Sequence, residues 1–476
     1  MGKVAALDYI VIILYFAAMI YAGYLGYKKT KDADSYFVAG RRLGGFMFTA
    51  CMVAVAMGGA STVGATRLGY KFGLSGAWMN IMIGIGIFLL GVLLATKISK
   101  LRMFTVSEML GKRYDRFSQL ISAIIMACYV SIIATIQIIG IGTIFHLLFG
   151  WSAFLSMLIA GIVVIAYTYA GGMWSVTLTD VVQFCVITVG IFFILLPCSL
   201  SRVGGFAGLS QLDPKYFAPM NIGKETVIAY FLLFVFGLLI GQDLWQRVFT
   251  ARTPQIARAG TAFAGLYSIL LGLATAVIGM CALIVFPKLE DPNFAFAYIS
   301  AETVPIGLLG LVLAAALAAM MSTASGPILA SSTLICTDII GGFVKKGKYT
   351  KEQLVKWGKI VSLINGAVCL ICALWIQDII SAIDLAYNLL TGAMFFPIMG
   401  AILWKRSTWQ GSIAGMLCGA IVVIQQMAAK GMTSTDAIIY GLLASLIGFV
   451  VVSLLTPPMS KEKAAEWEAE LNSVEE

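Results

Sequence analysis

Two apolar segments are interrupted by glycine and carry the residue types that bind ions or small solutes inside a membrane. The first has the sequence Gly-Gly-Ala-Ser-Thr over residues 58–62, and the second has Gly-Gln-Asp over residues 241–243. Gly-Gly followed by Ser-Thr makes a poor continuous helix. Unwound backbone is tolerated at membrane depth only where it lines a cavity or a binding site. Both segments are therefore predicted to be broken helices, with tight glycine packing as the alternative interpretation.

A third segment places oxygen atoms on one helical face. Ala319, Ser322 and Ser325 follow one another at intervals of three residues and so share a face, with Thr323 beside them. Pro327 frees a backbone carbonyl in the same stretch. Hydroxyls and carbonyls can hold a hard cation without burying a full charge. The pattern indicates a cation site, unless the hydroxyls merely donate back to their own helix.

Asp180 is a candidate of a different kind. It follows the loop Tyr-Ala-Gly-Gly-Met-Trp over residues 169–174 and opens another apolar segment as Thr-Asp-Val-Val-Gln over residues 179–183. A carboxylate inside a membrane is costly, which makes it a candidate for ion binding. The competing interpretation is an acid at a helix N-terminus, satisfied by backbone N–H groups at the membrane surface. The sequence leaves both interpretations open.

The elements that must position these residues are membrane spans. Of the 476 residues, 60% are hydrophobic and 12% are charged, whereas soluble domains are about 25% charged. Such an apolar excess requires lipid as the solvent. We predict an all-α polytopic membrane protein with about 13 transmembrane helices, near residues 7–27, 46–67, 76–96, 117–148, 152–171, 180–201, 226–250, 260–286, 305–338, 357–376, 379–404, 409–430 and 434–456.

Charge sets the expected topology and excludes several functions. With the N-terminus outside, 24 of the 32 Lys and Arg residues fall in inside loops, as cytoplasmic loops require, and Arg247 is counted among them with the loop residues 247–258. We therefore expect a multi-pass protein of the inner cell membrane. Residues 1–456 would form one transporter domain, and residues 457–476 a charged cytoplasmic tail. These loops explain the net charge of +9, so no nucleic-acid partner is expected. The single histidine, His146, excludes a multi-histidine metal site, and no enzyme is predicted.

Three stretches of the chain resemble the sodium/solute symporter family. They are Tyr-Phe-Val-Ala-Gly-Arg-Arg-Leu-Gly-Gly over residues 36–45, the stretch from Tyr167 to Gln183, and Ala-Met-Met-Ser-Thr-Ala-Ser over residues 319–325. The resemblance implies the LeuT-type fold, which is built from two inverted repeats. It implies a first repeat over residues 46–201 and an inverted second repeat over residues 226–404, with flanking helices.

The same resemblance implies ion ligands at named positions. The main sodium site would join the carbonyls of Ala54 and Met57 to Ala319, Ser322 and Thr323. A second sodium would use Asp180, Ser322 and Ser325. The last position of that second site is Gly326 here, where a serine is expected, so one sodium is predicted, with a second as the alternative.

The resemblance leaves the solute open. The positions that align with the aromatic residues of choline carriers are Ala56 and Gly241, so an aromatic cage for a quaternary ammonium is not expected. A carboxylate such as pantothenate or a monocarboxylate, an amino acid and a sugar remain. The protein is expected to act as a monomer. A sodium-independent uniporter or channel and a solute-sensing protein are the alternatives. Candidate solute-binding residues are Gly58, Ser61, Thr62, Gln137, Gly241, Gln242, Trp245, Tyr387 and Asn388.

Overall fold

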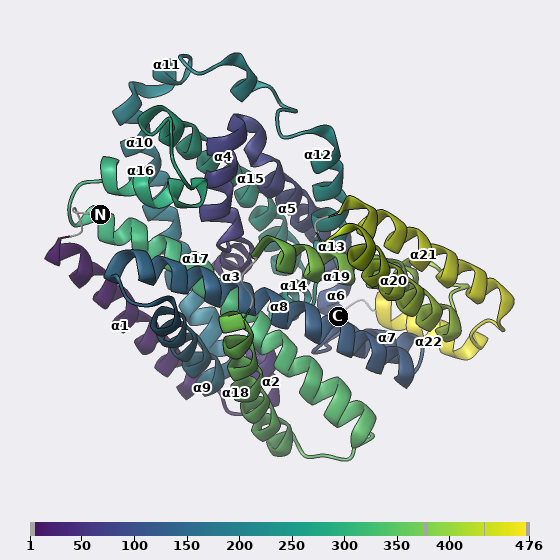
Figure 1. Cartoon of the computed structure of the whole chain (residues 1–476). Coiled ribbons are helices and arrows are strands. Elements are labelled where there is room, and N and C mark those ends of the chain that lie inside the picture. The colour runs from purple at the N-terminus through teal and green to yellow at the C-terminus, as the bar shows by residue number, and fades with distance from the viewer. Residues whose placement is uncertain (1–4, 376–378, 433, 473–476) are drawn as a thin grey trace.

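The computed structural model describes residues 5–375, 379–432 and 434–472, and these residues fold almost entirely into helices (Figure 1). Within them the one β-type pairing is an isolated parallel bridge between Leu43 and Ala251. The predicted all-α class is therefore confirmed. The end of the predicted span 357–376, the start of the predicted transporter domain and the end of the predicted tail fall outside the described residues.

The first half of the chain contains the first glycine-interrupted helix and the segments that follow it. Two flanking helices and a short turn precede it: α1 (Ala6–Lys29), α2 (Ala33–Val38) and η1 (Ala39–Arg41). The elements from there to residue 203 are α3 (Gly45–Ala56), η2 (Ala60–Gly64), α4 (Ala65–Phe72), η3 (Gly73–Ala77), α5 (Trp78–Leu89), η4 (Leu90–Leu94), α6 (Ala95–Lys100), α7 (Val106–Arg113), α8 (Arg116–Phe149), α9 (Ala153–Thr188), η5 (Val189–Leu195) and α10 (Leu196–Val203).

The second half repeats the pattern of an interrupted helix followed by long spans. It begins with α11 (Gly205–Leu209), η6 (Pro214–Phe217), α12 (Lys224–Tyr230), η7 (Phe231–Val235), α13 (Phe236–Ile240) and α14 (Gln242–Val248). It continues with α15 (Pro254–Val285), η8 (Pro292–Phe294), α16 (Ala295–Thr303), α17 (Leu308–Leu334), η9 (Ile335–Val344), α18 (Lys351–Trp375), α19 (Ile379–Leu403), α20 (Trp409–Lys430), α21 (Thr435–Leu455) and α22 (Lys461–Asn472).

The number of spans differs from the predicted thirteen. Among the described residues, ten helices are long and apolar enough to cross a membrane, or eleven with the bent pair Lys224–Ile240 and Gln242–Val248. Two of the ten are continuous stretches of 41 and 51 residues, Ala60–Lys100 and Ala153–Val203. At 1.5 Å per residue each is roughly twice the thickness of the hydrocarbon layer. Each contains a glycine at positive φ, Gly73 and Gly172. The count of thirteen stays a prediction.

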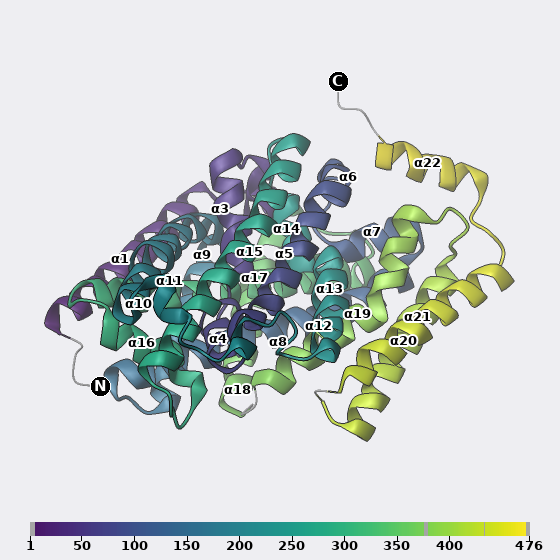
Figure 2. The same ribbon diagram turned by 90° about the horizontal axis from the view of Figure 1, so that it is seen from above.

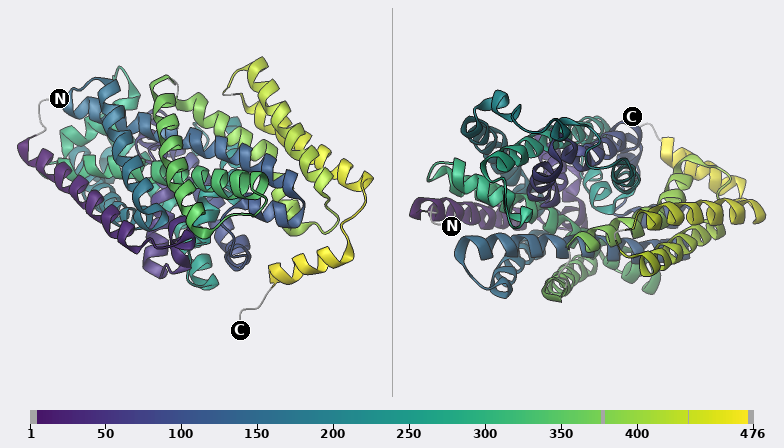
Figure 3. Two further views of the ribbon diagram at one scale, coloured as in Figure 1. Left: turned by 90° about the horizontal axis from the view of Figure 1, so that it is seen from below. Right: turned by 45° about the horizontal axis from the view of Figure 1, so that its top comes forward.

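Helix α17 forms the centre of the bundle. It packs against α8, α9 and α1, and every residue from Val312 to Leu334 is buried. On the other side, α15 packs against α3, α4 and α5. Helices α20 and α21 pack on each other and on α19, and lie to one side of the bundle in Figures 2 and 3. The core that holds the two interrupted helices is therefore built from α8, α9, α15 and α17.

The charged end of the chain is helical where the structure describes it. Helix α22 returns to the bundle, because the indole N–H of Trp467 donates to the Ala401 carbonyl at 2.9 Å. Lys112 and Glu470 form an ion pair at 2.6 Å across an exposed surface. Exposed pairs of this kind contribute little to stability, so the buried indole is the main anchor.

Candidate functional site

The first predicted helix break is confirmed. Helix α3 ends at Ala56, Met57 has φ −97° and ψ 47°, and helical structure resumes at Ala60 as the π-helix η2. Because the chain leaves the helix at Met57, the carbonyls at the end of α3 lack their usual partners four residues later. The released groups need donors from another element.

Those donors come from α17, at the residues that the sequence singled out. The Ser322 hydroxyl lies 2.8 Å from the Ala54 carbonyl oxygen and 2.9 Å from the Ala319 carbonyl oxygen. The Thr323 hydroxyl donates to the Val55 carbonyl at 3.1 Å. Both hydroxyls are buried. Four predicted sodium ligands thus gather at one point where two helices meet, and all of them are oxygens suited to a hard cation.

Both interpretations of the α17 hydroxyls hold in part. Ser325 donates to the Ser322 carbonyl at 3.2 Å, which is the bond back to its own helix. Ser322 contacts both its own helix, at the Ala319 carbonyl, and α3, at the Ala54 carbonyl, whereas Thr323 reaches across to α3. No described contact joins the Met57 carbonyl to either hydroxyl, and the Met57 N–H donates to Ala54 at 3.3 Å.

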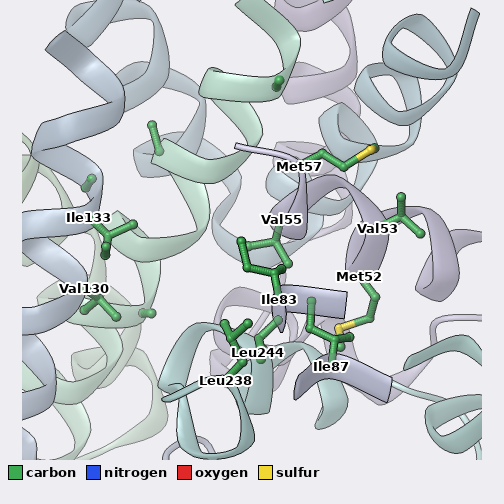
Figure 4. Packing of buried hydrophobic residues seen from close by; sticks show 14 of the residues in the cluster. Met52, Val53, Val55, Met57, Ile83, Ile87, Val130, Ile133, Leu238 and Leu244 are labelled. Atoms are coloured by element: carbon green, nitrogen blue, oxygen red, sulfur yellow. The ribbon is translucent and has the colours of Figure 1, made fainter. Parts of the chain in front are cut away.

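Apolar packing holds the break in place. Figure 4 shows Val55 of α3, Ile83 of α5 and Leu244 of α14 lying together below the interruption. All three belong to the buried core. Val130 and Ile133 of α8, which belong to the same core, lie to the left of these three residues in the view of Figure 4. The break is therefore enclosed by apolar side chains, which strengthens ion–oxygen interactions within it.

A cavity reaches the break from the side of η8. Its volume is about 450 Å³, and it extends from Gly59 and Gln137 to Asp291 and Asn293. The Gly59 N–H donates to Gln137 Oε1 at 3.0 Å, so this predicted residue joins α8 to the unwound backbone. Other residues that line the cavity are Val63, Met79, Ile136, Tyr230, Phe234 and Met320.

Ser61 and Thr62 close the break from within rather than line the cavity. The Ser61 hydroxyl donates to the Ala56 carbonyl at 3.0 Å, and the Thr62 hydroxyl to the Gly58 carbonyl at 3.1 Å. Both side chains are buried. They satisfy carbonyls that the interruption releases, which is a structural role for two predicted solute-binding residues in this conformation.

The second predicted break is also confirmed, at Gly241 with φ −63° and ψ 126°. The helix bends there by 41°. Gln242 Oε1 accepts from the Val106 N–H at 2.8 Å, and its amide donates to the Phe104 carbonyl at 3.3 Å. The Trp245 indole donates to the Leu239 carbonyl at 2.9 Å and is fully buried. Gly241, Gln242 and Trp245 therefore do not line the cavity in this conformation.

The two predicted residues of α19 lie behind the cavity. Tyr387 packs against Phe234, a cavity residue, at 5.1 Å between ring centroids, and against Tyr129 at 5.5 Å. Asn388 is buried, and its Oδ1 has no hydrogen-bond partner among the described residues. Neither residue contributes to the cavity surface as it stands.

Asp180 is deeply buried, and its partner is a residue that the sequence reasoning placed elsewhere. It lies eight residues beyond the Gly172 kink in α9, so the interpretation as a helix N-terminal acid is wrong. Its Oδ2 lies 3.2 Å from Nη2 of Arg247, and the two side chains are 0% and 1% exposed. Arg247 was assigned to a cytoplasmic loop. The structure buries it because α14 continues inward past Gly241.

Three cavity residues were not among the candidate solute-binding residues taken from the sequence. Arg67 lines the cavity and donates to Asn293 Oδ1 at 2.8 Å. Its place at the end of the predicted span 46–67 favours a side chain that extends to the membrane surface instead. Tyr230 and Phe234 supply aromatic surface that the alignment of Ala56 and Gly241 did not anticipate. Phe234 lies in η7 and Tyr230 directly before it, about two and three helical turns ahead of the second break.

The fold and the two breaks define a class. A helical membrane protein with one interrupted helix in each half is typical of secondary transporters, the LeuT-type fold among them. The profile of the sodium:solute symporter family matches residues 36–419, and the chain belongs to that family. It is accordingly a sodium-coupled transporter and not an enzyme.

Individual relatives are similar over nearly the full length. The chain is 25% identical over 472 residues to the osmoregulated proline transporter OpuE of Bacillus subtilis, covering 94% of each chain. It is 28% identical over 492 residues to sodium/proline symporter 2 of Staphylococcus saprophyticus, covering 95% of this chain and 92% of the relative.

A solved structure confirms the fold. A Na⁺-coupled sialic acid symporter in a substrate-bound outward-open state superposes with a TM-score of 0.85 at 20% identity, covering 96% of this chain and 99% of the other. At 20% identity, this likeness is evidence for the fold and not for the solute. The predicted LeuT-type architecture is therefore confirmed.

Proposed function

We propose that this protein imports a small amino acid, L-proline in the first instance, together with sodium. The observation that carries the proposal is the convergence of the Ser322 hydroxyl on the Ala54 and Ala319 carbonyls at the base of a cavity. Sodium would be held there by these three groups with Met57 and Thr323. The named relatives that carry proline motivate the choice of solute.

The chemistry of the site fits sodium rather than a transition metal. The gathered ligands are neutral oxygens from carbonyls and hydroxyls, which suit hard cations. Within the described residues no group of three or more His, Cys, Asp or Glu is placed to bind a metal. Sodium would replace the hydrogen bonds that Ser322 and Thr323 now make to α3. It would therefore tie α3 to α17 as the hydroxyls do.

The deep end of the cavity suits a carboxylate. The half-helix formed by η2 and α4 begins at Ala60, and its unpaired N–H groups and positive dipole end lie beside Gly59. Gln137 offers a further polar group at the same point. The remaining surface is largely apolar, with Met79, Ile136, Phe234 and Met320 among its residues. A compact zwitterion with an apolar ring matches this combination better than a sugar, which needs many polar partners.

Transport would follow by alternating access. The cavity is open toward η8, and the opposite side is closed by the contacts of Gln242 with residues 104–106. The excess of Lys and Arg on the Gln242 side supports a cytoplasmic position for that side. Sodium and solute bind tighter together than apart, because each organises the Ala54–Gly59 backbone that the other uses. The repeats 46–201 and 226–404 would move against each other within one monomer.

The test is uptake by purified protein in proteoliposomes. We expect an inward sodium gradient to drive accumulation of radiolabelled L-proline, with collapse of accumulation when choline replaces sodium. Pantothenate, lactate, glucose and alanine serve as competitors. Equal uptake with and without sodium would identify a uniporter or channel. Sodium-dependent uptake of another competitor, with none of proline, would correct the solute but keep the ion site.

A further inference from the structure

Asp180 and Arg247 form a buried ion pair beside Gly326, which follows Ser322 by about one turn of α17. Arg247 Nη2 lies 3.2 Å from Asp180 Oδ2, and the Cys51 thiol donates to the same oxygen at 3.0 Å. Arg247 Nη1 donates to the Asp243 carbonyl at 3.1 Å. A guanidinium keeps its proton in proteins, so the negative charge of Asp180 already has a cation beside it.

Gly326 provides the space for that cation. A Cβ added at this position would lie 2.5 Å from Nη2 and 2.6 Å from Nη1 of Arg247, which is closer than real side-chain contacts allow. Any residue other than glycine would therefore displace the guanidinium from its present place. The guanidinium of Arg247 can therefore occupy its position only because residue 326 has no side chain.

Two neighbouring polar side chains, Ser325 and Asp243, already have hydrogen-bond partners of their own. The Ser325 hydroxyl donates to the Ser322 carbonyl at 3.2 Å. The nearby carboxylate of Asp243 accepts from the Tyr129 hydroxyl at 3.3 Å and lies in the first turn of α14, where a helix favours negative charge. Asp180 Oδ1 is buried without a partner among the described residues. A sodium ion on that oxygen would share one carboxylate with a guanidinium in a site of low dielectric, where like charges repel strongly.

We propose that Arg247 is a built-in cation that takes the place of a second sodium ion at Asp180, so that the protein binds and transports one sodium per cycle. Asp180 is then a positioning residue. Its carboxylate holds Arg247, and Arg247 in turn links α14 to α9 and α17. The proposal rests on the proposed sodium-coupled function and assigns its stoichiometry. Gly326 determines the number of ions, because it admits the guanidinium.

The decisive measurement counts sodium on the purified protein without solute. Binding of ²²Na⁺ at saturation should give one ion per chain, with a sodium Hill coefficient near one. Two ions per chain in the unmodified protein would overturn the proposal. The count needs no variant and no knowledge of the solute. A failure of proline uptake would therefore refute the proposed solute and leave this result intact.

Paired variants separate a positioning role from an ion ligand. The double variant D180N/R247Q removes both charges together and should still bind one sodium with near wild-type affinity. Loss of sodium binding in that folded variant would place Asp180 among the ligands and overturn the proposal. S322A is the matched control, with sodium affinity expected to fall about 10–100-fold, as losses at metal sites do.

The reciprocal variant should create a second sodium site, which the wild type is proposed to lack. R247Q/G326S removes the guanidinium and adds a hydroxyl beside Asp180, so the count should rise toward two sodium ions per chain. G326S alone should destabilise the protein without adding an ion, because the guanidinium remains and is displaced. A count that stays at one in a well-folded R247Q/G326S variant would show that Arg247 does not stand in for sodium.

Discussion

At the first break, between Ala56 and Ala60, the released carbonyls face the hydroxyls of α17 and the base of a cavity. At the second break, at Gly241, the neighbouring Gln242 turns the other way and bonds to residues 104 and 106. Each break has one glutamine that joins it to another element. Gln137 at the first accepts from Gly59, and Gln242 at the second accepts from Val106.

The difference between the two breaks shows that a helix interruption can either bind a ligand or close one side of the protein. A helix interruption releases backbone groups in either case, and the partners decide the role. Where the partners are small hydroxyls next to open volume, the interruption can bind. Where the partners are buried side chains and a neighbouring loop, it closes one side of the protein. The two breaks are thus a binding element and a closing element.

Removing the hydroxyls of the binding element should have the largest effect. In the double variant S322A/T323A we expect the sodium concentration for half-maximal uptake to rise about 10–100-fold. The solute requirement at saturating sodium should change far less. Sodium titration of uptake in proteoliposomes measures both. S325A is the matched control, since Ser325 bonds within its own helix, and unchanged sodium dependence in S322A/T323A would refute the site.

The glutamine of the binding element comes next. The change Gln137→Ala leaves the Gly59 N–H without its acceptor and removes a polar group from the cavity. We expect a loss of about 1.5 kcal/mol, roughly tenfold in the KM for the solute. Initial rates of uptake against solute concentration measure it. A KM equal to that of the wild type would show that the solute binds away from Gly59.

The glutamine of the closing element should change conformation more than solute affinity. The change Gln242→Ala leaves the buried Val106 N–H without an acceptor, at a cost of about 1–3 kcal/mol to the closed arrangement. Hydrogen exchange over residues 101–113 should speed up, and the KM for the solute should rise less than in the Gln137→Ala variant. A larger rise in KM would place Gln242 in the solute site after all.

The smallest effect concerns Glu108, next to the closing contacts. Burial raises its pKa above the ordinary value of 4.5, although the Phe104 N–H donates to its carboxylate at 2.8 Å and opposes the shift. The folded protein therefore holds this proton more tightly than the unfolded chain. Its stabilising contribution is full below pH 4.5 and is lost as the pH rises through the raised pKa.

Glu108→Gln should remove that dependence. We expect the melting temperature of the variant in detergent to equal or slightly exceed that of the wild type at neutral pH, and the two to agree near pH 4. Thermal unfolding across this pH range measures the difference. If the melting temperature of the variant fell below that of the wild type at neutral pH but not at pH 4, the ionised form of Glu108 would stabilise the protein, contrary to this prediction.

Much of the architecture was predictable because membranes constrain sequence strongly. Apolar length predicted a bundle of membrane spans, although the structure has ten or eleven among the described residues where thirteen were expected. Glycine followed by polar residues predicted both breaks, since lipid forbids unpaired backbone elsewhere. The spacing of Ala319, Ser322 and Ser325 predicted a shared face of α17. Local rules sufficed for these features, because each depends on neighbours within a few residues.

The partners across the bundle were not predictable in the same way. The sequence could not tell that Gln242 meets residues 104–106, or that Trp245 is enclosed rather than exposed to a solute. It counted Arg247 among the loop charges because a charge near the end of an apolar run is normally solvated. A charged residue only four positions after Asp243 in an interrupted helix was the available signal that it lies inside.

The sequence by itself determined that this chain lies in a membrane, where its helices break, and which oxygens of α17 face one side. Those properties follow from hydropathy, backbone chemistry and helical period. Only the tertiary structure decided that the Ala54 carbonyl meets Ser322, and that the guanidinium of Arg247 fills the space left by Gly326. Both pairings join residues far apart in the chain, and the packing of whole helices brings them within a few ångströms.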